Sequence, residues 1–139
     1  MKLENQVCSL ELAKKLKELE VKQNSLFYWI DVFENMEGNE ECWQIHHISW
    51  LEKEKESYHV TSAFTCGELG EMLPNSIDKF VMVIMKMNKG TWVCGYYKDL
   101  KEMFYEVGDK ILVNAMALML IWLIENKMME VGSERSKNS

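Results

Sequence analysis

The stretch that decides the fold runs from Ile111 to Ile124 and reads ILVNAMALMLIWLI, with Asn114 as its only polar residue. A bilayer span takes about 20 apolar residues, so this segment is too short to cross a membrane, but it suffices for a helix of roughly four turns. A helix that is apolar on every side must be covered on every side. The segment therefore predicts either the central helix of the core or a helix that contacts another chain, and it predicts no membrane span.

The rest of the chain predicts one α+β domain over residues 1–131 and a small, polar, disordered tail over residues 132–139. A leading helix from about Leu10 to Glu20, with Ser9 as its N-cap, precedes two units made of strands followed by a helix. Short turns join the strands, which implies antiparallel pairing. We expect an antiparallel sheet of four to six strands packed with helices, in the order α-ββ(β)-α-ββ(β)-α.

The boundaries of these units follow from local signals. The segment T-C-G-E from Thr65 to Glu68 is a capping box that starts the second helix, and Pro74 ends it. The charged segment Leu51–Ser57 is expected to be a connection. The expected strands are Ser25–Phe33, Cys42–Trp50, Tyr58–Ala63, Lys79–Met87, Thr91–Lys98 and Glu102–Val107, of which the last also fits a frayed helical turn.

Composition limits the class of protein. The net charge of −6 and the pI near 5.1 argue against broad phosphate binding, so we do not expect a nucleic-acid partner. Eleven methionines either fill gaps in the core or form an adaptable binding surface. The N-terminus is charged where a signal peptide needs an apolar stretch, and the four cysteines form no C-x-x-C pair. We therefore expect a cytoplasmic protein with free thiols.

Three segments carry a family resemblance: SLELAKKLKELEVKQNSLFYW (Ser9–Trp29), SAFTCGELGEMLP (Ser62–Pro74) and AMALMLIWLIENK (Ala115–Lys127). In order and wording they resemble a family of small proteins found in phages, prophages and other mobile elements of gut bacteria. The resemblance implies a cytoplasmic accessory protein made in an infected or lysogenic bacterial host, and it brings no catalytic residues with it. Members of that family carry more charge on the outer side of the last helix, where this chain has Val113, Ala117, Leu120 and Ile124.

Cys66 is the best candidate for a nucleophile. It follows the Thr65 cap and so lies in the first turn of a helix, where unpaired amides and the helix dipole favour a thiolate. A nucleophilic thiol also needs a base, which His59, His46 or His47 could supply only through the fold. The alternative is a small apolar side chain packed under the helix, and we assign no catalytic residue from the sequence.

Metal binding is not expected, and neither is a cofactor. His46 and His47 are neighbours on an expected strand, so their side chains point to opposite faces. Cys42 and His46 share a face, but four residues of strand separate them by about 13 Å. Because zinc–ligand bonds are about 2.0 to 2.3 Å, these two residues would need a bend, or help from Cys66 or Cys94, to share a zinc ion.

Two contact surfaces are predicted. The first is the tip of the first hairpin, which lacks the residue pattern of a calcium-binding loop and is either an ordinary solvated loop or a surface that presents negative charge to a basic partner. The second is the outer side of the last helix. The residues of these surfaces are Glu34, Glu37, Glu40 and Glu41 at the tip, and Val113, Ala117, Leu120 and Ile124 on the helix.

These observations predict a non-catalytic accessory protein of a phage or mobile element that binds a protein partner. An inhibitor of a host nuclease-type defence is the concrete version, because such enzymes have basic nucleic-acid channels. A homodimer through the last helix would equally explain that helix. The alternatives are a small cysteine-dependent enzyme that uses Cys66, and a single-stranded nucleic-acid binder whose sheet aromatics stack on bases.

Overall fold

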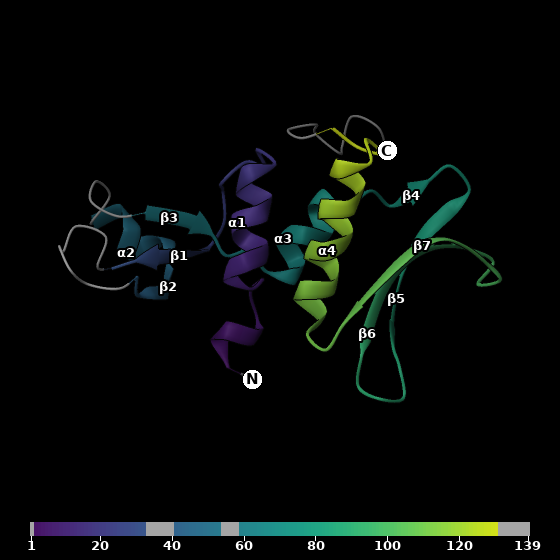
Figure 1. Cartoon of the computed structure of the whole chain (residues 1–139), viewed down its shortest axis with the longest axis horizontal. Coiled ribbons are helices and arrows are strands. Elements are labelled where there is room, and N and C mark those ends of the chain that lie inside the picture. Colours follow the sequence, from purple (N-terminus) through teal and green to yellow (C-terminus); the bar gives the residue numbers. More distant parts are fainter. Residues whose placement is uncertain (1, 33–40, 54–58, 131–139) are drawn as a thin grey trace.

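The computed structural model describes residues 2–32, 41–53 and 59–130. A layer of helices lies between two antiparallel sheets (Figure 1). The helices are α1 (Leu10–Glu18), α2 (Ile48–Lys53), α3 (Cys66–Met72) and α4 (Leu112–Glu125), preceded by the short 3-10 helix η1 (Leu3–Asn5).

The first sheet has the order β2-β1-β3 and the second has the order β4-β5-β6-β7. The strands are β1 (Phe27–Asp31), β2 (Trp43–His47), β3 (His59–Ser62), β4 (Ser76–Ile77), β5 (Phe80–Lys86), β6 (Trp92–Lys98) and β7 (Glu102–Asp109). The predicted α+β class is confirmed, and the predicted order holds with α2 and β4 added. The strands form two sheets where one was expected: β6 and β7 cover one side of α4, α1 and α3 cover other sides, and β1, β2 and β3 pair into a separate sheet.

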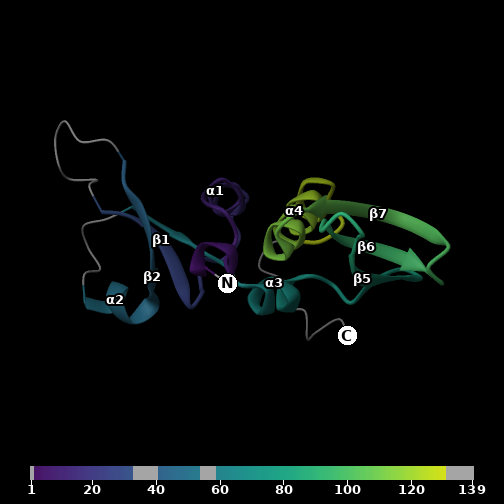
Figure 2. The ribbon, with the colours of Figure 1, turned by 90° about the horizontal axis from the view of Figure 1, so that it is seen from below.

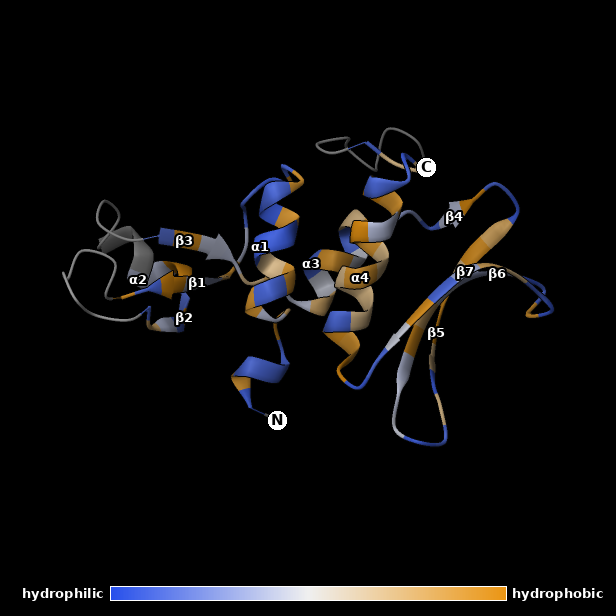
Figure 3. Cartoon of the chain, in the orientation of Figure 1, coloured by the Kyte–Doolittle hydropathy of each residue, from blue (hydrophilic) through white to orange (hydrophobic). Residues whose placement is uncertain are grey.

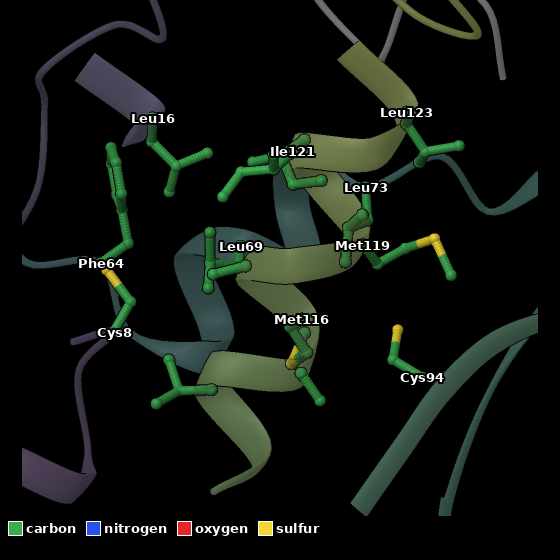
Figure 4. Close-up of a cluster of buried hydrophobic side chains, with 14 of the residues drawn as sticks. Cys8, Leu16, Phe64, Leu69, Leu73, Cys94, Met116, Met119, Ile121 and Leu123 are labelled. Atoms are coloured by element: carbon green, nitrogen blue, oxygen red, sulfur yellow. The ribbon is translucent and has the colours of Figure 1, made fainter. Parts of the chain in front are cut away.

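Helix α4 is the centre of the core. Nine of its residues are buried, and it packs against α1, α3, β6 and β7. In Figure 4 side chains of α3 and α4 interdigitate, and Cys94 approaches them from β6. The Asn114 side-chain oxygen accepts the backbone N–H of Ser9 at 2.8 Å, so the one polar residue of the apolar run ties it to the start of α1. No helix in the described part of the chain is long and apolar enough to cross a membrane.

The two predicted helix starts are confirmed. The Ser9 hydroxyl accepts the backbone N–H of Leu12 at 3.4 Å, which caps α1. At α3 the Thr65 hydroxyl accepts the N–H of Glu68 at 3.2 Å, and the Glu68 carboxylate accepts the N–H of Thr65 at 2.9 Å. Both caps satisfy amides that have no partner within the helix.

The expected strand Cys42–Trp50 is shorter in the structure. The expected connection Leu51–Ser57 is wrong in its first three residues, because these belong to a helix. Strand β2 ends at His47, and α2 follows directly. The His47 ring nitrogen Nδ1 accepts the N–H of Ser49 at 3.1 Å, and the Trp50 ring stacks on His46 with centroids 4.3 Å apart. His47 thus caps the start of this short helix, and His46 packs against it. The sequence pattern did not reveal this helix.

The first sheet has helices on both of its faces (Figure 2). On one face the Lys14 ammonium of α1 lies 4.7 Å from the centre of the Trp43 ring. On the same face the Trp29 indole N–H donates to the Cys8 carbonyl at 3.0 Å. On the opposite face α2 packs through the stacked pair of Trp50 and His46. Tyr28 and Ile30 of β1 are buried as a result.

Candidate binding surfaces

The second sheet has one covered face and one bare face. Its covered face packs against α4, with Cys94 and Tyr96 of β6 completely buried. Successive residues of a strand point to opposite sides, so their neighbours point away from the core. These neighbours, which we call the outer sheet face, are Val81, Val83 and Met85 of β5, Val93, Gly95 and Tyr97 of β6, and Met103 and Glu106 of β7.

The outer sheet face is apolar and partly exposed: Val83, Met85 and Val93 are half-buried, and Tyr97 is only 8% exposed. Val81 and Met103 lie on either side of Tyr97 in the strand register, and they are 51% and 53% exposed. Figure 3 shows apolar residues along these strands as well as along α4. None of the described helices packs on this face, because α4 contacts the sheet from the other side. Exposed apolar side chains grouped around a largely buried ring make this face a candidate contact site.

Tyr97 is held flat on this face. A side chain at Gly95 would bring its Cβ within 2.6 Å of the Tyr97 ring, so the ring occupies the space above the glycine. The Tyr97 hydroxyl donates a hydrogen bond to the Glu106 carboxylate. Glycine at this position is therefore required by the ring, and the result is a flat apolar surface with one carboxylate at its margin.

The outer side of α4 does not form a free contact surface. Val113 and Leu120 are each 1% exposed and Ala117 is completely buried, all within the single chain. Ile124 is half-buried and packs against the same core. The physical reason is that α1, α3 and the second sheet surround this helix. The predicted contact through these four residues is thus corrected, because a partner could reach the first three only if the core opened.

The acidic hairpin tip lies mostly outside the described residues, which include neither Glu34, Glu37 nor Glu40. Glu41 is described and exposed. Its carboxylate accepts the Trp43 indole N–H at 3.0 Å and lies 4.0 Å from the Lys14 ammonium. This residue therefore takes part in a local network with α1. The predicted tail over residues 132–139 also lies outside the described residues.

The charge of the chain is uneven. Residues 1–75 contain fourteen acidic and seven basic residues, whereas residues 76–139 contain eight acidic and nine basic residues. On α1 the lysines have partners within the protein: Lys14 lies over Trp43, Lys15 pairs with Glu125 at 3.3 Å, and Lys17 donates to the Val60 carbonyl at 2.6 Å. The carboxylates of Glu11 and Glu18 are exposed and form none of these pairs. Contacts with a ring or a carbonyl leave Lys14 and Lys17 charged, so the acidic excess belongs to residues 1–75 as a whole and not to α1.

Cys66 does not have the environment of a nucleophile. Partial burial raises the pKa of its thiol, in contrast to the lowered pKa expected in the first turn of a helix. The thiol lines a pocket of about 480 Å³, and of the described residues around that pocket none is a histidine. His59 lies at the start of β3, opposite Asp31 in the register. His46 and His47 are engaged at α2, as described above.

Metal-ligating residues are dispersed. No group of three His, Cys, Asp or Glu side chains in the described segments is placed to hold a metal ion. Cys8 and Cys94 are buried, and burial raises the pKa of each thiol to about 11. Both are part of the apolar core around α4.

The outer sheet face is the surface that sequence reasoning missed. The segment FVMVIM, residues 80–85, is apolar at every position, so alternation could not tell which side the core would take. The available signal was that both faces of this strand are apolar while one helix can cover only one of them.

Comparison of the chain with family models, with curated proteins and with solved structures finds no match.

Proposed function

We propose that the protein is a non-catalytic accessory protein of a phage or mobile element, and that it binds a host protein through the outer sheet face. The observation that carries this proposal is the exposure of apolar side chains on a flat strand surface that none of the described helices covers. Burying such surface against a partner is favourable by roughly 25 cal/mol for each Å² removed from water. The phage origin rests on the family resemblance.

The chemistry of the face favours a protein over a nucleic acid. Stacking of bases on a sheet requires positive charge to hold the phosphates. The outer sheet face contains no lysine or arginine, and its one charged side chain is Glu106. A partner that fits would offer an apolar patch with a cationic side chain opposite this carboxylate.

The charge of the whole chain favours a basic partner. With a net charge of −6, the protein attracts cationic surfaces and repels a second copy of itself. Proteins that handle nucleic acids have cationic channels. We therefore propose a nuclease-type defence protein of the host as the target class, bound with loss of its activity.

Reaction chemistry is disfavoured at the one candidate nucleophile. A raised pKa keeps the Cys66 thiol protonated at neutral pH, and a thiol is a much weaker nucleophile than a thiolate. The function we propose needs no reacting group, because occupation of the target's surface is sufficient.

The test has two stages. Tagged protein is used to capture partners from a host lysate, and the captured protein is identified, purified and titrated against the wild-type chain. We expect the double variant Val81→Lys, Met103→Lys to bind at least about tenfold more weakly, since a lysine in a desolvated apolar contact costs 1.4 kcal/mol or more. Leu26→Lys, at a residue 52% exposed near the first sheet, is the matched control and should bind like wild type.

Two results would overturn the proposal. Equal affinity of the double variant and wild type would show that the outer sheet face is not the contact. A wild-type dimer in light scattering that the double variant converts to monomer would show that the face binds a second copy.

A further inference from the structure

We propose that the pocket lined by Cys66 binds a small aromatic molecule with one carboxylate group. The pocket has a volume of about 480 Å³, which is in the range typical of small-molecule sites, roughly 300 to 1,000 Å³. It lies between the two sheets, where η1 and the starts of α3 and α4 meet. The site is separate from the outer sheet face and does not depend on the function proposed above.

The walls are mainly apolar and include an aromatic ring from each sheet. Phe27 comes from β1 and Trp92 from β6, while Ile111, Leu112 and Val113 contribute the start of α4. Each ring has a neighbour that limits its movement. Phe27 packs edge-on against His47 with centroids 5.5 Å apart, and the Lys86 ammonium lies 5.3 Å from the centre of the Trp92 ring. Rings fixed in this way favour a planar aromatic ligand.

Lys110 supplies the charge that selects an anion. Lys110 is an exposed residue that lines the pocket, and within the described segments its ammonium group forms no ion pair. Two carboxylates that adjoin pocket residues in the sequence, Asp109 and Glu68, accept backbone N–H groups and form no ion pair with Lys110 in the described segments. Asp109 accepts the N–H of Ile111 at 2.8 Å, and Glu68 accepts the N–H groups of Leu26 and Thr65, each at 2.9 Å. A carboxylate on the ligand would therefore meet an available cation.

Cys66 gives the pocket a built-in reporter. It is partly exposed in the pocket wall, whereas Cys8 and Cys94 are buried in the core. Cys42 is partly exposed but lies beside β2, and its N–H donates to Asp31. A ligand in the pocket should shield Cys66 from alkylation and leave Cys42 unchanged.

The experiment uses indole-3-acetate as the probe and indole-3-acetamide as its neutral match. Each is titrated into the full chain while alkylation of Cys66 and Cys42 by iodoacetamide is followed by peptide mass spectrometry. We expect saturable protection of Cys66 alone, with the acetate binding up to about fivefold more tightly than the acetamide, the upper range for a partly exposed charge pair. Lys110→Gln should abolish this difference, and Lys101→Gln, on an exposed turn, should preserve it.

A second variant tests the cavity itself. Gly67 lines the pocket, and a Cβ built there meets nothing nearer than the Thr65 hydroxyl at 3.9 Å, so Gly67→Leu should fill the space while α3 keeps its geometry. We expect this variant to lose protection by both probes. Absence of saturable protection in wild type, or an acetate preference unchanged in Lys110→Gln, would overturn the proposal, whether or not Gly67→Leu folds.

Discussion

The two sheets are built from similar material but are covered differently. In the first sheet β1 alternates the aromatic residues Phe27 and Trp29 with Tyr28 and Ile30, and helices lie on both faces. In the second sheet β5 is apolar on both faces as well, but Phe80 and Met82 of its inner face pack against the core around α4, whereas none of the described helices packs on its outer face. Apolar residues on the uncovered face add little to the stability of this chain. The contact proposed above would give these residues a role that the described fold does not give them.

The largest effect is expected from a substitution that disrupts α4, the helix that packs on the inner face of the second sheet. Leu120 of α4 is 1% exposed, so Leu120→Lys would place an unpaired charge in the core. We expect a loss of about 4 kcal/mol or more in the free energy of unfolding, measured in urea. Ile124→Lys is the control with a smaller effect, because this residue is only half-buried and a lysine there can extend its ammonium group to water.

A different outcome would move α4 from the core to an interface. If Leu120→Lys stayed folded and only lowered the mass in light scattering from dimer to monomer, the helix would be covered by a second copy of the chain. The assignment of α4 to the core would then be wrong.

The starts of α1 and α3 could be predicted from the sequence because their signals are local, whereas the start of α2 could not. Ser9 and Thr65 each cap a helix by accepting the backbone N–H of the residue three positions later. The burial of α4 could also be predicted, because the run around Asn114 is apolar on every side. The division into two sheets could not be predicted, because it depends on contacts between segments far apart. The pocket was missed for the same reason, since Phe27 and Trp92 approach it from different sheets.

The dependence of stability on alkaline pH tests the burial of two cysteines, Cys8 and Cys94. Burial raises the pKa of Cys8, whose carbonyl is bonded to Trp29, and of Cys94, on the inner side of β6, from 9.0 to about 11. The folded chain therefore keeps these protons when the unfolded chain has lost them. The stability is fully present below pH 9 and falls as the pH rises to about 11, by about 2–3 kcal/mol for each thiol.

Single variants separate these thiols from the other groups that titrate at high pH. Stability curves in urea between pH 8 and 11 should fall less steeply for Cys8→Ala and for Cys94→Ala than for wild type. An unchanged slope in Cys94→Ala would mean that water reaches the covered face of the second sheet, and the contrast between its two faces would be lost.

The hydrogen bond between Asn114 of α4 and Ser9 at the start of α1 is expected to contribute less to stability. Asn114→Leu would add apolar surface to α4 but remove the acceptor of the Ser9 N–H. Because a buried amide would be left without a partner, we expect a loss of about 1–3 kcal/mol in spite of the gain in hydrophobicity. Hydrogen exchange should locate the effect, with the Ser9 amide losing protection before its neighbours. A variant as stable as wild type, with Ser9 still protected, would show that water replaces the asparagine.

The smallest expected effect is the most specific test of the bare face. Val81 and Met82 are neighbours on β5, but Val81 lies on the outer sheet face and Met82 packs against the core. Val81→Lys should change the free energy of unfolding by less than about 0.5 kcal/mol, whereas Met82→Lys should lower it by about 1–3 kcal/mol. Both are measured by urea unfolding of the purified chain. If the two variants lost equal stability, the outer sheet face would already be covered in the isolated protein, and its exposed valine and methionine could no longer be explained by a partner.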